Sequence, residues 1–467
     1  MRILGIVLAA GQGKRMKSKL YKVMHPVCGK PLVGHVVDVL DEVNADRKVV
    51  IVGHGAETVK AYLGDRAEYA MQAEQLGTGH AAMQAEALLE GEDGIALITT
   101  GDTPLISADS LGAMIRQHIE SGASASVLTA MVDQPFGYGR IVRNADGLVT
   151  AIVEQKDCTP EQQWIREINT GIGCFDKHKL FQALKQLKND NAQREYLLTD
   201  VFGILAEQGD KVLGYCTADA TEGMGINDRV QLSEAERVMR GRINRRHMLN
   251  GVTIIDPSNT YIEKEVQIGA DTVVYPGTFL RGVTVIGEDC MIGPHADMTN
   301  TVVRNGTTVQ HSVLTDATVG EETAIGPFAY LRPGSRIGNQ VKIGDFVEIK
   351  NAELGDGTKV SHLSYVGDAV VGKNVNIGCG AITVNYDGYN KNITEICDDA
   401  FVGSNVNLIA PVRIGEGAYV VAGSTITHEV PAGDLAIARE RQTNKPGYAD
   451  KLRQRFKAIK AKKQESK

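Results

Sequence analysis

The chain has 467 residues, of which 43% are hydrophobic and 23% charged, and its formal net charge is −7. These values are ordinary for a folded globular protein, so disorder of the whole chain is excluded, and the length predicts two or three domains. No apolar run is long enough to span a bilayer, so we expect no membrane insertion. Seven scattered cysteines form no CxxC pair, which indicates reduced thiols and a cytoplasmic protein.

The charge is unevenly distributed along the chain. Residues 439–467 contain eleven Lys and Arg against three Asp and Glu, a balance of +8, so the remainder carries −15. A basic tail of this kind could bind nucleic acid, but most such tails are solvated ends. We therefore expect no nucleic-acid partner.

The first half alternates short apolar runs with segments of helical period. The runs at 3–10, 48–52 and 95–100 read as strands that end in glycine-containing turns, with helical patterns at 32–40 and 80–89. This alternation predicts an α/β domain with a doubly wound parallel sheet. Ligands of such sheets bind beyond the carboxyl ends of the strands, which is where candidate site residues are sought.

The second half has a different texture. From about residue 252 an aliphatic residue recurs every six positions, and thirteen times Ile, Val or Leu is followed directly by Gly. This is the hexapeptide signature of a β-helix, in which each step is one strand and one corner. The aliphatic side chains should point into the column, as in the series Val319, Ile325, Leu331, Ile337, Ile343 and Ile349. The polar interval 385–390 should leave the column as a loop.

These patterns divide the chain into three segments. We expect an α/β domain at residues 1–226, an amphipathic linker helix at 227–250, and a parallel β-helix with a basic tail at 251–467.

The turn after the first strand is a candidate phosphate site. It carries Gly11 and Gly13, which expose backbone N–H groups, together with Lys14 and Arg15. A Rossmann fingerprint would need a third Gly where Met16 stands, and a P-loop would need Ser or Thr in place of Arg15. A plain tight turn stays a rival interpretation.

Two further features are candidate ligand contacts. Asp102 follows the strand 95–100 and is suited to Mg²⁺, although a helix cap or a surface carboxylate explains this residue equally well. The segment 72–81 combines small residues with amides that could read a base edge.

In the second half, His362 lies among short polar residues, and Arg332 and Lys350 are expected at corners of the column. Two cations near one corner indicate an anionic ligand such as a sugar phosphate. A lone histidine is more often structural than catalytic.

Taken together, these residues resemble the sugar-1-phosphate nucleotidyltransferases. The nearest family is that of the bacterial bifunctional N-acetylglucosamine-1-phosphate uridyltransferases/glucosamine-1-phosphate N-acetyltransferases. The resemblance covers nearly the whole chain, and it implies that residues 1–226 form a uridyltransferase domain and that residues 251–467 form a left-handed parallel β-helix with acetyltransferase activity. In the first half it is carried by Leu8–Met16, Lys22, Gln72–Ala81, Gly101–Asp102, Gly137–Arg140, Glu154, Glu167–Gly171 and Asn227.

The resemblance implies roles for residues of the first half. Nucleotide and sugar would be bound by Leu8, Ala9, Ala10, Gly11, Arg15, Lys22, Gln72, Gly77, Thr78, Thr100, Gly101, Asp102, Gly139, Glu154, Asn169 and Asn227. Among these, Arg15 and Lys22 would neutralise the triphosphate of UTP, and Asp102 and Asn227 would hold Mg²⁺. The attacking sugar phosphate is already anionic, so it needs charge screening and alignment rather than a general base.

It implies a second site in the β-helix. His362 would be the general base that deprotonates the amine of glucosamine 1-phosphate. The aminosugar phosphate would contact Arg332, Lys350, Tyr365 and Asn376, with Glu348 nearby, and acetyl-CoA would contact Cys379, Asn385, Tyr386, Ser404, Ala422 and Arg439. By analogy the enzyme is a homotrimer with each acetyl-transfer site between neighbouring columns.

Some residues differ from those usual in the family, among them Tyr21, Thr100, Asp345, Asn351 and Cys379. Asp345 stands where Asn is usual and adds a negative charge close to the expected phosphate site. No expected catalytic group is missing.

We therefore predict a bifunctional enzyme that makes UDP-N-acetylglucosamine from glucosamine 1-phosphate, acetyl-CoA and UTP. Two other hypotheses compete with it: nucleotidyl transfer alone on an oligomerising β-helix, and a non-catalytic sugar-nucleotide sensor. His362 with Arg332 and Lys350 argues against the former, and Lys22 with Asp102 argues against the latter.

Overall fold

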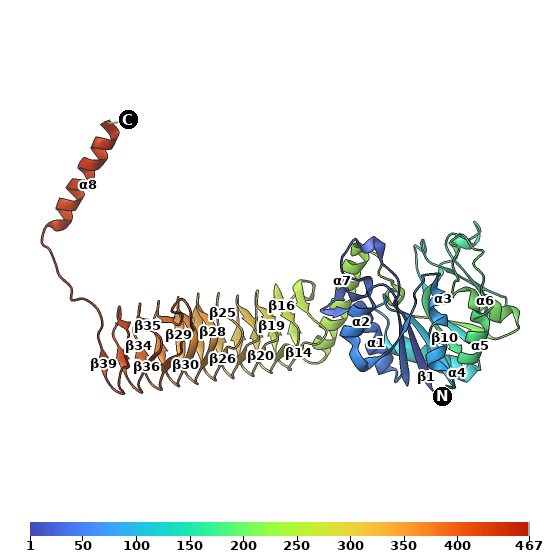
Figure 1. Cartoon of the computed structure of the whole chain (residues 1–467), viewed down its shortest axis with the longest axis horizontal. Helices are drawn as coiled ribbons and strands as arrows, with labels where there is room; N and C mark the ends of the chain where they lie inside the picture. Colours follow the sequence, from blue (N-terminus) through green and yellow to red (C-terminus); the bar gives the residue numbers. More distant parts are fainter. Residues whose placement is uncertain (466–467) are drawn as a thin grey trace. The chain divides into compact units, whose positions relative to one another are not determined.

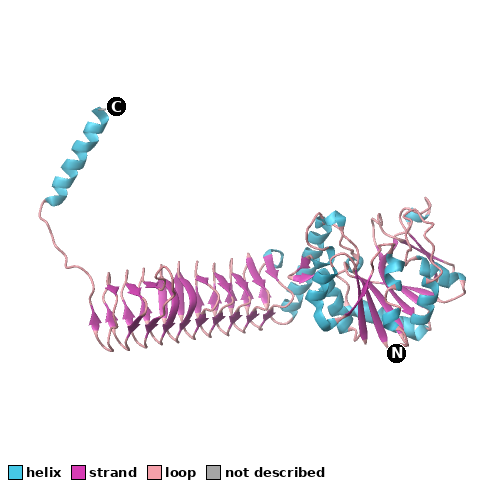
Figure 2. Cartoon of the chain, viewed as in Figure 1, coloured by secondary structure: helices cyan, strands magenta, loops and turns pink. Residues whose placement is uncertain are grey.

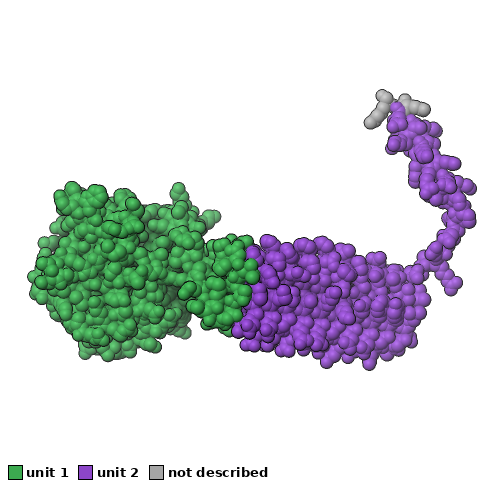
Figure 3. Space-filling model, turned by 180° about the vertical axis from the view of Figure 1, so that it is seen from behind, with its two compact units in different colours: residues 1–267, 279–283 green, residues 268–278, 284–467 purple. Residues whose placement is uncertain are grey.

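The computed structural model describes residues 1–465, with side chains to 464, so the last two residues of the predicted basic tail lie outside it. The chain forms two compact units, which Figure 3 shows in different colours. Unit 1 contains residues 1–267 and 279–283, and unit 2 contains residues 268–278 and those from 284 onward.

Unit 1 is built on a nine-stranded sheet whose central order is β11-β7-β10-β6-β1-β4-β5. Its strands are β1 (Ile3–Leu8), β4 (Arg47–Val52), β5 (Glu68–Met71), β6 (Ile95–Thr100), β7 (Ala125–Met131), β8 (Arg140–Arg143), β9 (Val149–Val153), β10 (Glu167–Asp176) and β11 (Val212–Cys216). A separate hairpin pairs β2 (Pro26–Val27) with β3 (Lys30–Pro31). The three runs predicted as strands correspond to β1, β4 and β6.

The sheet is not wholly parallel, which corrects the sequence-based expectation. β10 runs antiparallel to both β6 and β7, and β8 and β9 form an antiparallel pair beside it. Because Gly173 pairs with Ile98, the first residues of β10 extend past Thr100 at the carboxyl end of β6. The reversed strand therefore delivers Asn169 to the edge where the parallel strands end.

Helices cover both faces of this sheet (Figure 2). They are α1 (Leu32–Glu42), α2 (Ala56–Leu63), α3 (Thr78–Met83), α4 (Ala108–Ser121), α5 (Lys177–Leu184) and α6 (Asp200–Glu207). Strand side chains alternate between two cores: Leu4 and Ile6 pack with α3, α5 and α6, whereas Val7 packs with α1, α2 and α4. The doubly wound α/β architecture is thus confirmed.

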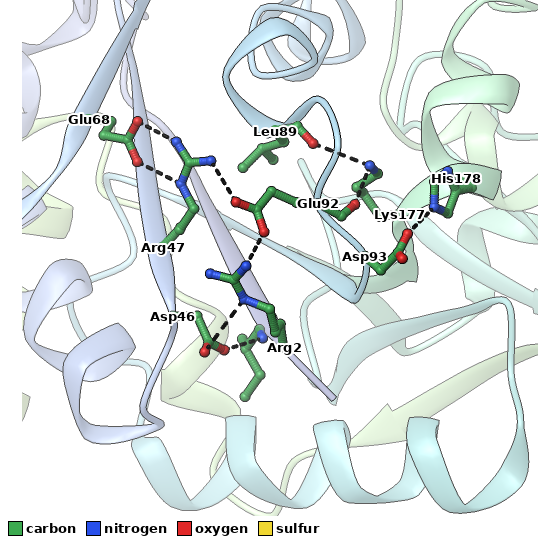
Figure 4. A network of polar contacts seen from close by, with 10 residues as sticks. Arg2, Asp46, Arg47, Glu68, Leu89, Glu92, Asp93, Lys177 and His178 are labelled. Atoms are coloured by element: carbon green, nitrogen blue, oxygen red, sulfur yellow. Dashed lines mark hydrogen bonds and ion pairs between the residues drawn. The ribbon is translucent and has the colours of Figure 1, made fainter.

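An ion-pair network fastens the opposite, amino edge of the sheet (Figure 4). Arg47, at the start of β4, pairs with Glu68 at the start of β5 and, at 3.2 Å, with Glu92 before β6. Glu92 also pairs with Arg2, just before β1. These contacts tie the strand starts together and leave the strand ends free for ligands.

Helix α7 (Arg229–Leu249) is the last α-helix of unit 1. Its N-cap Asp228 accepts hydrogen bonds from the amides of Val230 and Gln231 at 3.0 and 2.9 Å. Asn244 is fully buried on this helix and donates to the carbonyls of Pro257 and Thr260, so the segment after α7 is pinned to it.

From residue 253 the chain coils into stacked short strands, the rungs seen in Figure 1. One face is an 11-stranded parallel sheet of β12 (Thr253–Ile254), β15 (Val273–Val274), β18 (Met291–Ile292), β21 (Thr308–Val309), β24 (Ala324–Ile325), β27 (Lys342–Asp345), β29 (Lys359–His362), β31 (Asn376–Ile377), β34 (Phe401–Val402), β37 (Tyr419–Val420) and β39 (Leu435–Ala436).

The remaining strands form a 17-stranded sheet that wraps the other faces. They are β13 (Thr260–Ile262), β14 (Gln267–Ile268), β16 (Thr278–Arg281), β17 (Val285–Ile286), β19 (Asp297–Thr299), β20 (Val302–Val303), β22 (Val313–Thr315), β23 (Thr318–Val319), β25 (Tyr330–Leu331), β26 (Arg336–Ile337), β28 (Glu348–Leu354), β30 (Tyr365–Val371), β32 (Ile382–Val384), β33 (Thr394–Ile396), β35 (Asn407–Ile409), β36 (Val412–Ile414) and β38 (Thr425–Ile426).

Most successive coils repeat after 16 to 18 residues, as when Asp297 pairs with Val313, Val313 with Tyr330 and Tyr330 with Glu348. The six-residue aliphatic series points inward as predicted, with Val319 through Ile349 at most 4% exposed. The stacked parallel strands and their buried aliphatic series confirm the predicted parallel β-helix. The loop predicted at 385–390 leaves the column between β32 and β33.

The tail ends in the exposed helix α8 (Tyr448–Glu465). Within the described residues, no helix combines the length and apolarity needed to cross a membrane.

Candidate active sites

Two adjoining cavities open at the carboxyl edge of the sheet in unit 1. Their volumes are about 500 and 290 Å³, and both are lined by Leu8, Thr78, Thr100 and Asp102. Every residue that the family resemblance assigns to nucleotide or sugar lines one or both of them, except Gly101. The structure therefore gathers in one place residues that are spread from position 8 to position 227.

Backbone hydrogen bonds fix the loop after β1 in this cavity wall. Ala9 donates its amide hydrogen to the carbonyl of Ile51 at 2.9 Å, and the Gly101 amide donates to Leu8 at 2.9 Å. Gly101 thus supports the loop rather than lining the cavity. Tyr21, unusual for the family, donates its hydroxyl to the carbonyl of Ala9 at 2.6 Å and stiffens the same loop.

The smaller cavity has the amides expected for a nucleobase. Gln72 is 5% exposed and donates to the Gly77 carbonyl at 3.1 Å, which leaves its amide oxygen as an acceptor. Gly77 has φ 119, and a side chain there would meet the backbone of Tyr196 at 2.5 Å, so the position requires glycine. Gln75 also lines this cavity and was missed by the sequence interpretation, although it lies within the motif 72–81.

At the junction of the cavities, three polar side chains converge. The Lys22 ammonium pairs with Asp102 and also donates to the Asn227 amide oxygen at 3.3 Å. The two oxygens therefore face a common point, and both are the hard donors that Mg²⁺ prefers. Asp102 and Asn227 fit the predicted metal, with Lys22 and Arg15 supplying further positive charge beside it.

The larger cavity has a polar floor opposite this junction. Glu154 accepts a hydrogen bond from Thr199 at 3.3 Å, and the Asn169 amide donates to the Gly139 carbonyl at 2.9 Å. Burial raises the pKa of Glu154 above its usual value. This group of residues can accept and donate hydrogen bonds to the hydroxyls and amide of a sugar.

In unit 2, one row of residues brings His362 together with four other positions. On successive coils, backbone pairing places Asp345, His362, Cys379, Ser404 and Ala422 in equivalent places, each followed by a residue in the left-handed conformation. The backbone amides of the residues that follow donate to carbonyl groups on the preceding coil at 2.8 to 3.0 Å. Leu363 donates to Asp345, Gly380 to Leu363, Asn405 to Cys379, and Gly423 to Ser404. His362 and three of the residues assigned to acetyl-CoA therefore share one edge of the column.

Arg439 lies at the end of this row, next to Gly423. A Cβ atom added at Gly423 would lie 3.5 Å from the Cδ atom of Arg439. Asn385 and Tyr386 lie elsewhere: Asn385 bonds to Asp368 on β30, and Tyr386 is 57% exposed on the loop. The described contacts thus divide the residues assigned to acetyl-CoA between two groups.

A second group clusters around Asp368, which the sequence interpretation missed. Asp368 accepts hydrogen bonds from Lys350 at 2.9 Å, from Asn351 at 2.7 Å and from Asn385. Burial alone would raise the pKa of Asp368, but these hydrogen bonds outweigh it and lower the pKa below its usual range. The site therefore holds an ionised carboxylate that orients the Lys350 ammonium.

The predicted cations lie together on neighbouring coils. Glu348 pairs in register with Tyr365 and forms an ion pair with Arg332 at 2.8 Å. Lys391, on the loop, is a third cation of this group, because the neighbouring Lys350 lowers the pKa of the Lys391 ammonium. Its only signal in the sequence is its place on the projecting loop. Asn376 lies on β31, in register with Lys359.

Comparison with known proteins agrees with both halves. Residues 4–222 match the nucleotidyl transferase model, and residues 316–351 and 393–428 match the bacterial transferase hexapeptide model. The chain is 58% identical to Bifunctional protein GlmU of Brevibacillus brevis over 97% of this chain and 98% of the relative. It is 57% identical to that of Geobacillus sp. strain WCH70 over 96% and 97%, and 53% to that of Listeria monocytogenes serotype 4b over 96% and 98%.

The fold and the cavities therefore define a nucleotidyltransferase joined to a hexapeptide-repeat acyltransferase. The chain belongs to the family of bifunctional GlmU proteins. The predicted enzyme class is confirmed: a uridylyltransferase and an acetyltransferase of UDP-N-acetylglucosamine synthesis, which use a nucleotide and acetyl-CoA as small-molecule substrates.

Proposed function

We propose that the two reactions occur at separate sites, uridylyl transfer at the cavities of unit 1 and acetyl transfer at the His362 row of unit 2. The observation that supports this is the separate clustering of the predicted residues: one set lies around Lys22 and Asp102 in unit 1, and the other lies in unit 2, in the group around Asp368 and in the row through His362. With this assignment the functional segments are 1–226, 227–250 and 251–467.

In uridylyl transfer, a phosphate oxygen of N-acetylglucosamine 1-phosphate attacks the α-phosphorus of UTP, and pyrophosphate leaves. Asp102 and Asn227 would hold Mg²⁺, which supplies charge neutralisation to the phosphates when bound. Lys22 and Arg15 bind the triphosphate, while Glu154 and Asn169 orient the sugar. Because the nucleophile is already anionic, the residues contribute alignment and electrostatic stabilisation instead of proton transfer.

In acetyl transfer, the amine of glucosamine 1-phosphate attacks the thioester carbonyl of acetyl-CoA, and the C–S bond breaks to release CoA. His362 accepts the proton that the amine loses. Arg332, Lys350 and Lys391 bind the sugar phosphate. The thioester and the CoA moiety of acetyl-CoA lie beside Cys379, Ser404, Ala422 and Arg439.

A crossed pair of variants tests the two-site proposal. His362→Ala should abolish CoA release from acetyl-CoA and glucosamine 1-phosphate while pyrophosphate release from UTP persists. Asp102→Ala should abolish Mg²⁺-dependent pyrophosphate release and spare CoA release. Unchanged CoA release in His362→Ala would eliminate the proposed base, and joint loss of both activities in either folded variant would contradict separate sites.

The proposal includes a homotrimer, and an exposed row of side chains supports it. His295, His311, Phe328, Phe346 and Leu363 follow one another at the corner of successive coils; we call this row the corner ladder. Adjacent rings along it have centroids 5.3 to 5.5 Å apart, and Phe328, Phe346 and Leu363 are 55%, 58% and 57% exposed. A contiguous exposed apolar strip is typical of an interface.

The corner ladder ends where the acetyl-transfer site begins. Leu363 follows His362 directly, and the next corner positions are the small or polar residues Gly380, Asn405 and Gly423. A second column packed on the apolar part would therefore leave a groove beside the rest, as the family's intersubunit site requires. We also propose a cytoplasmic location, where UTP and acetyl-CoA are available.

A further inference from the structure

The acetyl-transfer base has a partner of its own. His362 ends β29 and Asp345 ends β27, and the two residues are direct partners in the parallel register of these strands. The Nδ1 atom of His362 lies 2.5 Å from Oδ1 of Asp345. This contact belongs to neither the phosphate cluster around Asp368 nor the residues assigned to acetyl-CoA.

The backbone holds this contact rigidly. Leu363 donates its amide to the Asp345 carbonyl at 2.9 Å, and the Ser364 hydroxyl donates to the carbonyls of His362 and Gly378 at 2.8 and 3.2 Å. Val360 on β29 and Ile343 on β27 are 0% and 1% exposed in the column. The two side chains are therefore positioned by packed strands and not by mobile loops.

The chemistry of the pair determines which ring nitrogen carries the proton. An ionised carboxylate only accepts hydrogen bonds, so Nδ1 must be the donor, and the lone pair of the neutral ring then lies on Nε2. The hydrogen bond from His362 lowers the pKa of Asp345, which keeps this carboxylate ionised. The His362 ring is 59% exposed, so Nε2 is accessible to a substrate.

We propose that Asp345 is a positioning residue for acetyl transfer: it holds His362 in the Nδ1–H tautomer and orients Nε2 toward the amine of the aminosugar. It touches no substrate in this role. From the sequence, the negative charge of Asp345 was expected to oppose phosphate binding. In the structure this carboxylate is instead hydrogen-bonded to His362. This inference rests on the proposed role of His362.

Three variants of the full-length enzyme test the inference, with steady-state CoA release as the readout. Asp345→Ala should lower kcat for acetyl transfer roughly 10- to 100-fold, with the KM for glucosamine 1-phosphate within about threefold of the parent. Asp345→Asn should retain most of the activity, because an amide oxygen can accept from the same N–H. Glu395→Ala, which removes an exposed carboxylate paired with Arg413 elsewhere on the column, should change nothing.

Two readouts separate positioning from a structural role. Pyrophosphate release from UTP should be unchanged in all three variants, and ¹⁵N NMR of His362 should show the Nδ1–H tautomer in the parent and loss of that preference in Asp345→Ala. A kcat within twofold of the parent in Asp345→Ala, an equal loss in Asp345→Asn, a change confined to KM, or an Nε2–H tautomer in the parent would each overturn the inference. If His362→Ala retains CoA release, it is the proposed base itself that fails.

Discussion

Lys22 and Asp102 form an ion pair although 80 positions separate them, and only 12% and 18% of their side chains are exposed. The loop after β1 contributes the cation, and the turn after β6 contributes the carboxylate. Because the pair lies where the two cavities meet, it places positive charge beside the oxygens of Asp102 and Asn227, where we propose that Mg²⁺ and the triphosphate bind.

Removing this cation should affect one reaction only. Lys22→Met should reduce pyrophosphate release from UTP roughly 100- to 1,000-fold, because a preorganised charge in a shielded site is lost. CoA release should stay at the parent rate. Lys19→Met, three residues before Lys22 and exposed, is the matched control and should be neutral. Uridylyl transfer within threefold of the parent in Lys22→Met would contradict the assignment.

Asp38 on α1 gives a prediction about pH and stability. Burial alone would raise its pKa, but hydrogen bonds from Lys30, Arg66 and Lys264 at 2.6, 2.8 and 3.0 Å lower it to about 2. Because the pKa of Asp38 is lower in the folded protein than in the unfolded chain, its carboxylate stabilises the fold. This stabilisation is present at pH values above the unfolded pKa near 3.8 and is lost as the pH falls toward 2. At one pKa unit per 1.36 kcal/mol, this contribution is about 2 kcal/mol at neutral pH.

Asp38→Asn should therefore destabilise α1 at pH 7 by about 2 kcal/mol, and the difference from the parent should shrink as the pH falls below 4. Hydrogen exchange of the α1 amides measures this local opening. Glu57→Gln, whose carboxylate is 89% exposed, should leave exchange unchanged at both pH values. A penalty from Asp38→Asn that persists at low pH would show that the contribution is not electrostatic.

The sequence predicted the column well because its signal is local. An aliphatic residue every six positions specifies which side chains point inward, and these positions are buried almost throughout; Ile268, on an early coil, is only partly buried. The strands β1, β4 and β6 were predictable for the same reason, since each is a short apolar run that ends in a turn.

What the sequence could not predict depends on non-local pairing. The reversed direction of β10 follows from its partners on both sides, and it alone explains how Asn169 reaches the cavity. The row through His362 was also hidden, because the loop lengthens one coil and separates Cys379 from Ser404 by 25 positions instead of 17 or 18. Asp368 lies near the His362 motif but was assigned no role, since a carboxylate after a Gly is common on any surface.

Gly344 shows how closely the coils pack beside His362. A methyl group there would lie 2.0 Å from the carbonyl oxygen of Ser361, whereas one at Gly241 on α7 would meet nothing within 4 Å. Gly344→Ala should separate the coils, reduce CoA release more than tenfold and destabilise the column by about 1–3 kcal/mol. Gly241→Ala should stabilise α7 by up to about 1 kcal/mol.

Both glycine variants should keep the parent rate of pyrophosphate release. Thermal unfolding and the two coupled assays measure these effects on the same samples. Normal CoA release in Gly344→Ala would mean that the contact between Asp345 and His362 tolerates a displacement of its own strand.

The corner ladder predicts what holds the active oligomer together. Phe328 stacks between His311 and Phe346, with ring centroids 5.5 and 5.4 Å away, and is 55% exposed. Phe328→Glu places a charge in the middle of this strip, where burial against a second column would cost several kcal/mol. The variant should sediment as a monomer and lose CoA release, because the proposed homotrimer places each acetyl-transfer site between neighbouring columns. Val370→Glu, 48% exposed on β30 and outside the ladder, should remain a trimer.

Pyrophosphate release should persist in both variants, Phe328→Glu and Val370→Glu, since the cavities of unit 1 are complete within one chain. A trimeric Phe328→Glu enzyme with full acetyl transfer would exclude the corner ladder as the interface.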